Sequence, residues 1–214
     1  MSQRVGLRER KKEQTRRTLW NTAIELFEKR GFDAVSVAEI AAAADVSKMT
    51  VFNYFPTKED LVVGPMEEHN DEPARVVRER AVGESAVAAL RRQFLAALAE
   101  RDPATGLNDT PNVLSGQRLI LTTPSLRQRA YAFFVQSQGL LAKEFAAQTG
   151  EDDLTAHIAA AQTMGVRYAL VAENIRRLLD GETADAAYPG AVANAEHAFR
   201  MLETGLGDYC TRRE

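Results

Sequence analysis

The 214-residue sequence predicts an all-α protein. Apolar residues recur at helical spacing along most of the chain, no segment sustains the alternation of a half-buried strand, and several of the seven prolines stand at plausible helix boundaries. The balance of 45% hydrophobic and 27% charged residues is typical of a folded globular chain. We expect an N-terminal three-helix head with a helix-turn-helix, residues 1–60, and a larger helical domain, residues 61–214.

The first helix is predicted over about residues 9–30. Leu19, Ala23, Leu26 and Phe27 fall on one face of such a helix, and the run "KRG" then places two cations in its last turn and a glycine just after it.

Charge is distributed unevenly along the chain. The first 17 residues hold seven basic and two acidic side chains, whereas residues 61–214 hold 16 basic and 21 acidic ones. This polarity suits a chain that orients on a polyanion, and it equally suits a solvated, frayed N-terminus.

Two very short helices follow the first. Ser36 with Glu39 forms the pattern of a capping box at the start of one, and Ser47 caps the other, which Pro56 ends. Asp45 stands in the tight turn between them, where we expect positive φ, which aspartate tolerates better than most residues.

Two short helices joined by such a turn form a helix-turn-helix, and the second is short enough to fill a major groove about 12 Å wide. Helical spacing turns one set of side chains toward the first helix, namely Val51, Tyr54 and Phe55. It turns another set outward, namely Lys48, Met49, Phe52 and Asn53. The hydroxyls of Ser47, Thr50 and Tyr54 suit phosphate oxygens, and Lys58 adds a charge at the start of a fourth helix, which Thr57 caps with Asp60. The alternative interpretation is an αα-corner inside a helical enzyme.

Longer helices are expected in the rest of the chain, at about residues 61–70, 84–102, 112–121, 124–149, 152–180 and 188–212. The loop "RDPATGLNDTPN" interrupts them. The fourth helix would be shared between the two domains.

Several classes of function lack their sequence patterns. The single cysteine, Cys210, excludes disulfide frameworks and cysteine-based zinc sites, and the three histidines stand in no metal motif. The run "EEHNDE" could hold a metal through Glu68, His69 and Asp71, but it reads more simply as the polar end of a helix. No apolar run reaches a membrane-spanning length and no signal peptide is evident, so we expect a cytoplasmic protein without a cofactor. An enzyme and a helical ligand-binding protein without DNA function remain the rival hypotheses.

The segment "SVAEIAAAADVSKMTVFNYFPTKEDLV" resembles the N-terminal signature of the TetR/AcrR transcriptional regulators, and the upstream Ala23, Leu26, Phe27, Gly31 and Phe32 fit the same pattern. The resemblance covers about residues 12–62. Three positions depart from it: Asp45 replaces a usual turn glycine, Met49 a small residue and Phe52 a tyrosine. The remaining chain resembles the family in length, helical content and order of helix sizes.

The resemblance implies a homodimeric DNA-binding regulator, usually a repressor, that leaves a palindromic operator when a small molecule binds its larger domain. It implies phosphate contacts from Ser36, Ser47, Thr50, Tyr54 and Lys58, base contacts from Lys48, Met49, Phe52 and Asn53, and general charge from Arg16 and Arg17.

An effector pocket would lie among the fourth to eighth helices and would take a lipophilic molecule. The candidate lining residues, most of whose apolar members could equally be plain core, are Met66, Phe94, Leu98, Leu114, Arg118, Leu121, Tyr131, Phe134, Gln138, Tyr168, Val171 and Asn174.

A dimer also suits the geometry, because one short recognition helix reads few bases and a two-fold pair reaches successive major grooves. By analogy with the family, the last two long helices would form the interface, since they carry large apolar side chains and many small residues. The alternative is that these helices only complete the core of the monomer.

Overall fold

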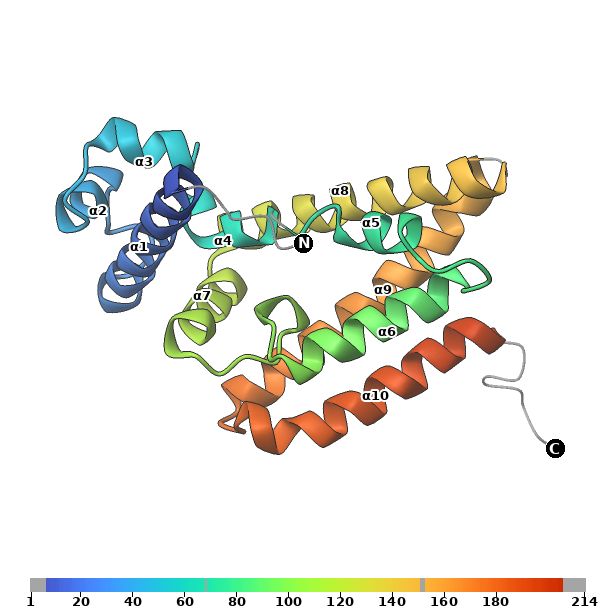
Figure 1. Ribbon diagram of the computed structural model, residues 1–214. Helices are drawn as coiled ribbons and strands as arrows, with labels where there is room; N and C mark the ends of the chain where they lie inside the picture. Colours follow the sequence, from blue (N-terminus) through green and yellow to red (C-terminus); the bar gives the residue numbers. More distant parts are fainter. Residues whose placement is uncertain (1–6, 68, 151–152, 206–214) are drawn as a thin grey trace. The chain divides into compact units, whose positions relative to one another are not determined.

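The computed structural model describes residues 7–67, 69–150 and 153–205, and the described residues are helical apart from their connections (Figure 1). The all-α prediction is therefore confirmed. The chain forms two compact units: unit 1 comprises residues up to 67 together with 111–131, and unit 2 comprises 68–110 together with 132 onward. The predicted division by function at residue 60 is a different partition and stays a prediction.

Unit 1 contains α1 (Leu7–Arg30), α2 (Val37–Ala43), α3 (Lys48–Tyr54), α4 (Asp60–Glu67), α7 (Pro111–Thr122) and the first two turns of α8 (Pro124–Thr149). Helix α1 is its centre, because α2, α4 and α7 all pack against it. The side chains of Leu19, Ala23, Ile24 and Phe27 are fully buried along one face of α1. The apolar spacing read from the sequence therefore identified most of the face that organises this unit.

A close approach joins α7 to α1. A Cβ atom on Gly116 would lie 3.5 Å from Ile24 and 3.7 Å from Trp20, so the backbone of α7 passes directly over these side chains. Asn112, at the start of α7, donates to Asn21 of α1 at 2.9 Å. The segment 111–131 thus belongs to the same compact unit as the N-terminal helices, although it is distant from them in sequence.

Unit 2 contains α5 (Glu72–Arg78), α6 (Ala86–Ala99), the 3-10 turn η1 (Pro103–Thr105), the rest of α8, α9 (Asp153–Leu179) and α10 (Ala184–Thr204). Helix α10 runs along both α6 and α9, and α5 packs on α6. Helix α5 was not predicted from the sequence, because its seven residues are too few to establish an apolar period. Helix α10 also begins four residues earlier than expected, because Thr183 caps it and Pro189 is accommodated inside it.

The apolar stripe of α10 is buried within its own chain. Its members are Ala184, Ala187, Ala191, Ala195 and Phe199, and the ring of Phe199 lies 6.0 Å from that of Phe94 on α6. These residues of α10 therefore contribute to the core of unit 2, and the predicted dimer interface through the last two long helices stays a prediction. The small side chains of Ala187, Ala191 and Ala195 let α10 approach α6 and α9 closely.

The loop at residues 101–110 is held firmly inside unit 2. Asn174, buried on α9, donates to the carbonyl oxygen of Thr105 at 2.9 Å, and the amide of Ala184 donates to Asp109 at 2.8 Å. Gly106 has a φ of +74°, and a Cβ there would lie 2.5 Å from the carbonyl oxygen of Val171. Only glycine fits this position, because it both adopts positive φ and brings no side-chain atom against α9.

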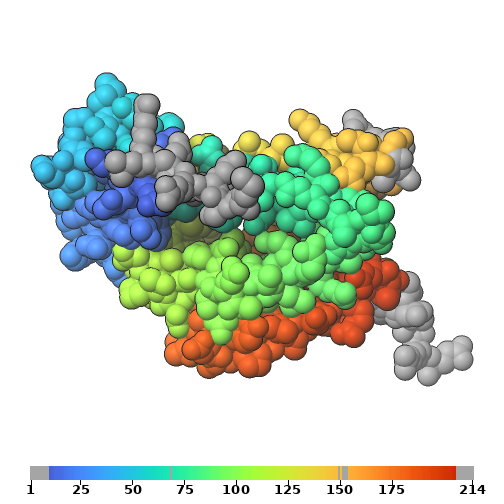
Figure 2. Space-filling view, in the orientation of Figure 1, coloured from blue at the N-terminus to red at the C-terminus, as the bar shows by residue number. Residues whose placement is uncertain are grey.

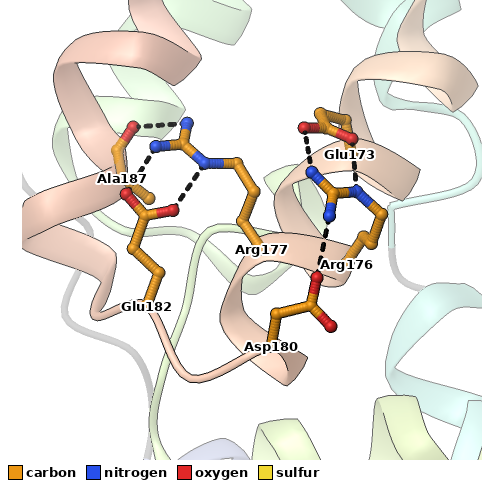
Figure 3. A network of polar contacts seen from close by, with 6 residues as sticks. All are labelled: Glu173, Arg176, Arg177, Asp180, Glu182 and Ala187. Atoms are coloured by element: carbon orange, nitrogen blue, oxygen red, sulfur yellow. Dashed lines mark hydrogen bonds and ion pairs between the residues drawn. The ribbon is translucent and has the colours of Figure 1, made fainter.

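A polar network fixes the connection between α9 and α10 (Figure 3). Arg177 donates to both carboxylate oxygens of Glu182, at 2.7 and 2.5 Å, and to the carbonyl of Ala187 at 3.0 Å. The neighbouring Arg176 turns to Glu173 and Asp180 on its own side of the helix. The Arg177 fork spans the connection, so it stabilises the turn that brings α10 back along α9.

No described helix is long and apolar enough to cross a membrane. Among the same residues, no group of three or more His, Cys, Asp or Glu side chains is arranged to hold a metal ion. Glu68 and Cys210 lie outside the described residues.

Candidate nucleic-acid interface

Helix α2 begins at the predicted capping box. The side-chain oxygen of Ser36 accepts from the amide of Glu39, and the Glu39 carboxylate accepts from the amide and hydroxyl of Ser36, both at 2.8 Å. Arg30, at the end of α1, donates to the same carboxylate at 2.7 Å. The hydrogen bond from the backbone amide of Ser36, together with the one from Arg30, lowers the pKa of Glu39 from 4.5 to about 2. These contacts join the end of α1 to the start of α2.

The turn between α2 and α3 has the predicted backbone conformation. Asp45 has a φ of +53°, so the expectation of positive φ at this position is confirmed. The amide of Val46 donates to the carbonyl of Ala41 at 2.9 Å and closes the end of α2. Asp45 thus adopts a left-handed conformation at the position where the resembled family pattern has a turn glycine.

Helix α3 is seated by its buried side and capped at its start. Val51 is fully buried and Phe55, just after the helix, nearly so, whereas Tyr54 is half-buried. Ser47 accepts from the amide of Thr50 at 3.0 Å, and the two hydroxyl oxygens lie 2.8 Å apart. Seven residues of helix are therefore held at both ends and along one side.

The outward side of α3 carries the four residues that spacing predicted. Lys48, Met49, Phe52 and Asn53 are all exposed, Met49 to 69% and Phe52 to 37%. In Figure 2, the light-blue to cyan surface of α2 and α3 lies largely uncovered in the view. The ammonium group of Lys48 stands 5.7 Å from the centre of the Phe52 ring. We call these four residues the outer face of α3.

Two of the predicted phosphate contacts have structural partners inside unit 1. Lys58 donates to the carbonyl of Phe32 at 2.6 Å, and its ammonium lies 4.4 Å from the Phe32 ring centre and 5.6 Å from that of Phe27. The hydroxyl of Ser36 donates to Glu39. In this structure, then, Lys58 links the segment just before α4 to the segment just after α1, and Ser36 serves as a helix cap.

The two arginines of α1 that were predicted to supply general charge differ in exposure and in their contacts within the protein. Arg17 is exposed. Arg16 is half-buried, donates to the carbonyl of Gly64 at 3.4 Å and lies over the ring of Phe55 at 5.4 Å. Arg17 and the exposed Arg10, Lys11 and Lys12 earlier on α1 thus form the freer positive surface of this helix.

An ion pair in unit 1 between a buried carboxylate and a partly exposed arginine was not predicted from the sequence. Asp60 is 2% exposed, and its carboxylate accepts from the amide of Thr57 at 3.0 Å and from Nε of Arg129, on α8, at 2.9 Å. The amide of Asp60 donates back to the hydroxyl of Thr57 at 3.2 Å, which confirms the predicted cap of α4. The partner on α8 lies 69 residues away in sequence, so no local pattern could have identified it.

The candidate pocket residues divide between the units. Unit 1 holds Met66, Leu114, Arg118, Leu121 and Tyr131; unit 2 holds Phe94, Leu98, Phe134, Gln138, Tyr168, Val171 and Asn174. Phe94 and Leu98 are buried core, whereas Arg118 is exposed, contrary to its expected inward position. The buried amide of Asn174 donates to Thr105, so a protein carbonyl, not a ligand, is its partner here. Phe134 and Tyr168 meet edge to face with ring centres 5.4 Å apart.

Arg167 is a buried charge in unit 2 that the sequence analysis did not single out. Its side chain is 11% exposed, it donates to Gln93 at 3.0 Å, and the nearest carboxylate oxygen of Glu72 is 3.9 Å away. Its guanidinium also lies over the ring of Phe94 at 5.4 Å. Burial lowers the pKa of Arg167 from its ordinary value. This guanidinium is therefore more loosely paired than the fork between Arg177 and Glu182.

Comparison with known families agrees with this geometry. Residues 19–63 match the model for "Bacterial regulatory proteins, tetR family", a segment that runs from within α1 into α4. Among curated proteins, the chain is 31% identical over 148 residues to the HTH-type transcriptional regulator TcmR of Streptomyces glaucescens, a match that covers 69% of this chain and 66% of TcmR. It is 54% identical over 44 residues to LuxR of Vibrio harveyi, covering 21% of this chain and 22% of LuxR.

Solved structures share the whole fold at lower identity. A TetR-family regulator from Mesorhizobium loti has a TM-score of 0.56 at 18% identity, covering 90% of this chain and 96% of that one. NalD of Pseudomonas aeruginosa has a TM-score of 0.55 at 18% identity, covering 87% and 97%. The matched proteins are transcriptional regulators and not enzymes, so the enzyme hypothesis is set aside. The chain belongs to the TetR family of bacterial regulatory proteins.

Proposed function

We propose that this protein is a homodimeric repressor that binds a palindromic operator through α3 and leaves it when a small lipophilic molecule binds unit 2. The outer face of α3 carries the DNA-binding part of the proposal. A short helix held at both ends presents four exposed side chains of mixed chemistry, and the basic start of α1 belongs to the same unit. Base edges need such a varied face, whereas phosphates need only charge and hydroxyls.

The dimer is supported by apolar side chains that the chain leaves exposed on α9 and α8. Leu154, Ile158 and Tyr168 on α9 are 50% or more exposed, and Val135 on α8 is 49% exposed. Leu154, Ile158, Ala161, Gly165 and Tyr168 follow one another at three- and four-residue steps, which is one stripe of a helix. Because the apolar stripe of α10 is buried in its own chain, we place the proposed interface on α9 and α8, and we keep the predicted α9–α10 interface as the alternative.

Molecular mass in solution tests this interface. Ile158→Glu places a charge in the proposed stripe and is expected to convert the dimer to a monomer, as measured by light scattering after size exclusion. Ala193→Glu, at an exposed position on α10, is the matched control and should leave the dimer intact. The reverse result, with dissociation caused by the α10 change alone, would favour the α9–α10 interface predicted from the sequence.

Binding across a salt series tests the DNA-binding claim. The full-length protein is titrated against DNA from upstream of its own gene and against sites selected from random DNA. We expect specific binding that weakens steeply with salt. Lys48→Ala should weaken binding by about tenfold, a loss on the scale of one good base contact, whereas Arg200→Ala, which removes an exposed charge from α10, should change it little. Equal losses in the two variants would contradict a role for α3.

The effector claim rests on the family and on the loosely paired polar groups of unit 2. One solved structure with this fold, at 19% identity, is FadR of Bacillus subtilis in complex with stearoyl-CoA. We therefore add stearoyl-CoA to the protein–DNA complex, with coenzyme A as the control that lacks the apolar chain. Release by stearoyl-CoA alone supports a lipophilic effector. Operator affinity unchanged by both compounds would count against an acyl-chain effector.

A further inference from the structure

The polar and apolar side chains of the outer face of α3 are arranged in a definite order around the helix. Successive residues turn by about 100° around a helix, so the four exposed side chains run around the face in the order Lys48, Phe52, Met49, Asn53. The two apolar side chains occupy the middle, and the cation and the amide form the edges. A solvated face of a helix more usually carries its apolar groups toward the core side.

The two central side chains do not stabilise the fold by burial. The core side of this segment is filled by Val51 and Phe55, both buried, and Met49 is 69% exposed. Phe52 keeps part of its ring against the chain, and the Lys48 ammonium lies 5.7 Å from its centre. Met49 and Phe52 therefore present apolar surface to the solvent. The positive charge of Lys48 beside them favours a partner that combines negative charge with an apolar group.

The major groove of DNA has this combination. Its rim is lined by phosphates, and its floor shows a single apolar substituent, the C5-methyl group of thymine. Methionine suits such a contact because its unbranched, polarisable side chain adapts to a small apolar target.

We propose that Met49 and Phe52 read thymine methyl groups at the centre of each operator half-site, while Lys48 and Asn53 contact the polar groups on either side. This assignment rests on the proposed DNA-binding function and adds to it the base that the middle of the face selects. It accounts for the two positions at which α3 departs from the family pattern, since both carry apolar side chains there.

Thymine-to-uracil replacement isolates the methyl group, because deoxyuridine keeps every hydrogen-bonding atom of thymidine. An operator is first selected from random DNA with the full-length protein, and each thymidine is then replaced singly by deoxyuridine. We expect one or two positions in each half-site at which removal of the methyl weakens binding by about fourfold, the effect of one buried methyl group.

Variants then link each methyl group to a side chain. In Met49→Ala, one of the sensitive positions should lose its sensitivity, and in Phe52→Ala the other should. Val82→Ala removes an exposed apolar side chain from a loop of unit 2 and should leave the whole uracil profile unchanged. All three positions are exposed, so unfolding midpoints should stay close to that of the unmodified protein.

The outcomes that would contradict the methyl readout can be told apart from the one that would also contradict the proposed function. A selected operator that tolerates uracil at every position overturns the methyl readout and leaves the regulator function standing. A uracil profile that is identical in both α3 variants also overturns it, because another residue would then read the methyl group. Failure to select any specific DNA overturns the methyl readout and the proposed function together.

Discussion

The two units of this protein are both helical, but the caps that start the short helices of unit 1 differ in range from the polar contacts that join the elements of unit 2. In unit 1, the short helices are fixed by bonds between residues three apart in sequence: Ser36 with Glu39, Ser47 with Thr50, and Thr57 with Asp60. In unit 2, the elements are fixed by bonds between residues more than sixty apart. These join Arg78 to Glu144, Thr105 to Asn174, and Asp109 to Ala184. Local contacts therefore shape the proposed DNA-binding surface, whereas long-range contacts join the elements of unit 2.

The largest effect is expected where unit 2 packs most closely. Gly106→Ala combines positive φ with a Cβ 2.5 Å from the carbonyl of Val171, and we expect a loss of about 3 kcal/mol in the free energy of unfolding. Gly181→Ala is the matched control, because Gly181 has a φ of +98° and open space around its Cβ. It should lose only the conformational part, about 1 kcal/mol. Equal losses, measured by chemical denaturation, would contradict the close approach.

The next largest effect is expected at the ion pair between Asp60 and Arg129 in unit 1. Asp60→Ala removes the acceptor for Arg129 and for the amide of Thr57. We expect the free energy of unfolding to fall by about 2 kcal/mol. This loss is below the usual range for breaking a fully buried pair, because Arg129 is 42% exposed. Asp71→Ala, which removes an exposed carboxylate that makes no helix-cap bond, should change stability by less than about 0.5 kcal/mol. If the two variants unfold alike, Asp60 does not hold α4 to α8.

The capping box of α2 should give a smaller effect with its own pH dependence. Ser36→Ala is expected to cost about 1 kcal/mol. For Glu39, the folded pKa of about 2 lies below the ordinary 4.5, so its stabilising contribution is complete above 4.5 and is lost as pH falls toward 2. The difference in denaturation midpoint between the protein and its Glu39→Gln variant should therefore be larger at about pH 6 than at about pH 3. A difference that grows toward low pH would contradict the lowered pKa.

The smallest effect is expected at the turn before α3. Asp45→Gly relieves a positive φ that aspartate already tolerates, so stability should rise by less than about 1 kcal/mol. Asp45→Val places a β-branched residue at the same φ and should be clearly destabilising. Calorimetry of the three proteins gives the order; a valine variant as stable as the glycine variant would show that the turn readily changes conformation.

The same contrast explains how far the sequence could predict the molecule. Helix α3, the caps at Ser36, Ser47 and Thr57 and the positive φ of Asp45 were all predicted, because their causes lie within a few residues. The partner of Lys58 was not, since the carbonyl of Phe32 lies 26 residues away in sequence.

The second unit was predicted mainly as a set of helices. Spacing alone could not decide whether the small residues of α10 pack on another chain or on α6, because both arrangements require the same residues. Arg167 also gave no local signal, since its neighbours come from α5 and α6. The candidate effector residues were therefore the least specific part of the prediction.

The most direct test of the account uses a variant in which Met49, Phe52 and Asn53 are all alanine. These side chains are exposed, so the variant should keep the helical content and unfolding midpoint of the original protein. Equilibrium binding to the selected operator is then measured beside binding to unrelated DNA of the same length. We predict that the variant binds both DNAs with the same low affinity. Retention of the original preference for the operator would contradict it, because the outer face of α3 would then not be the surface that reads DNA.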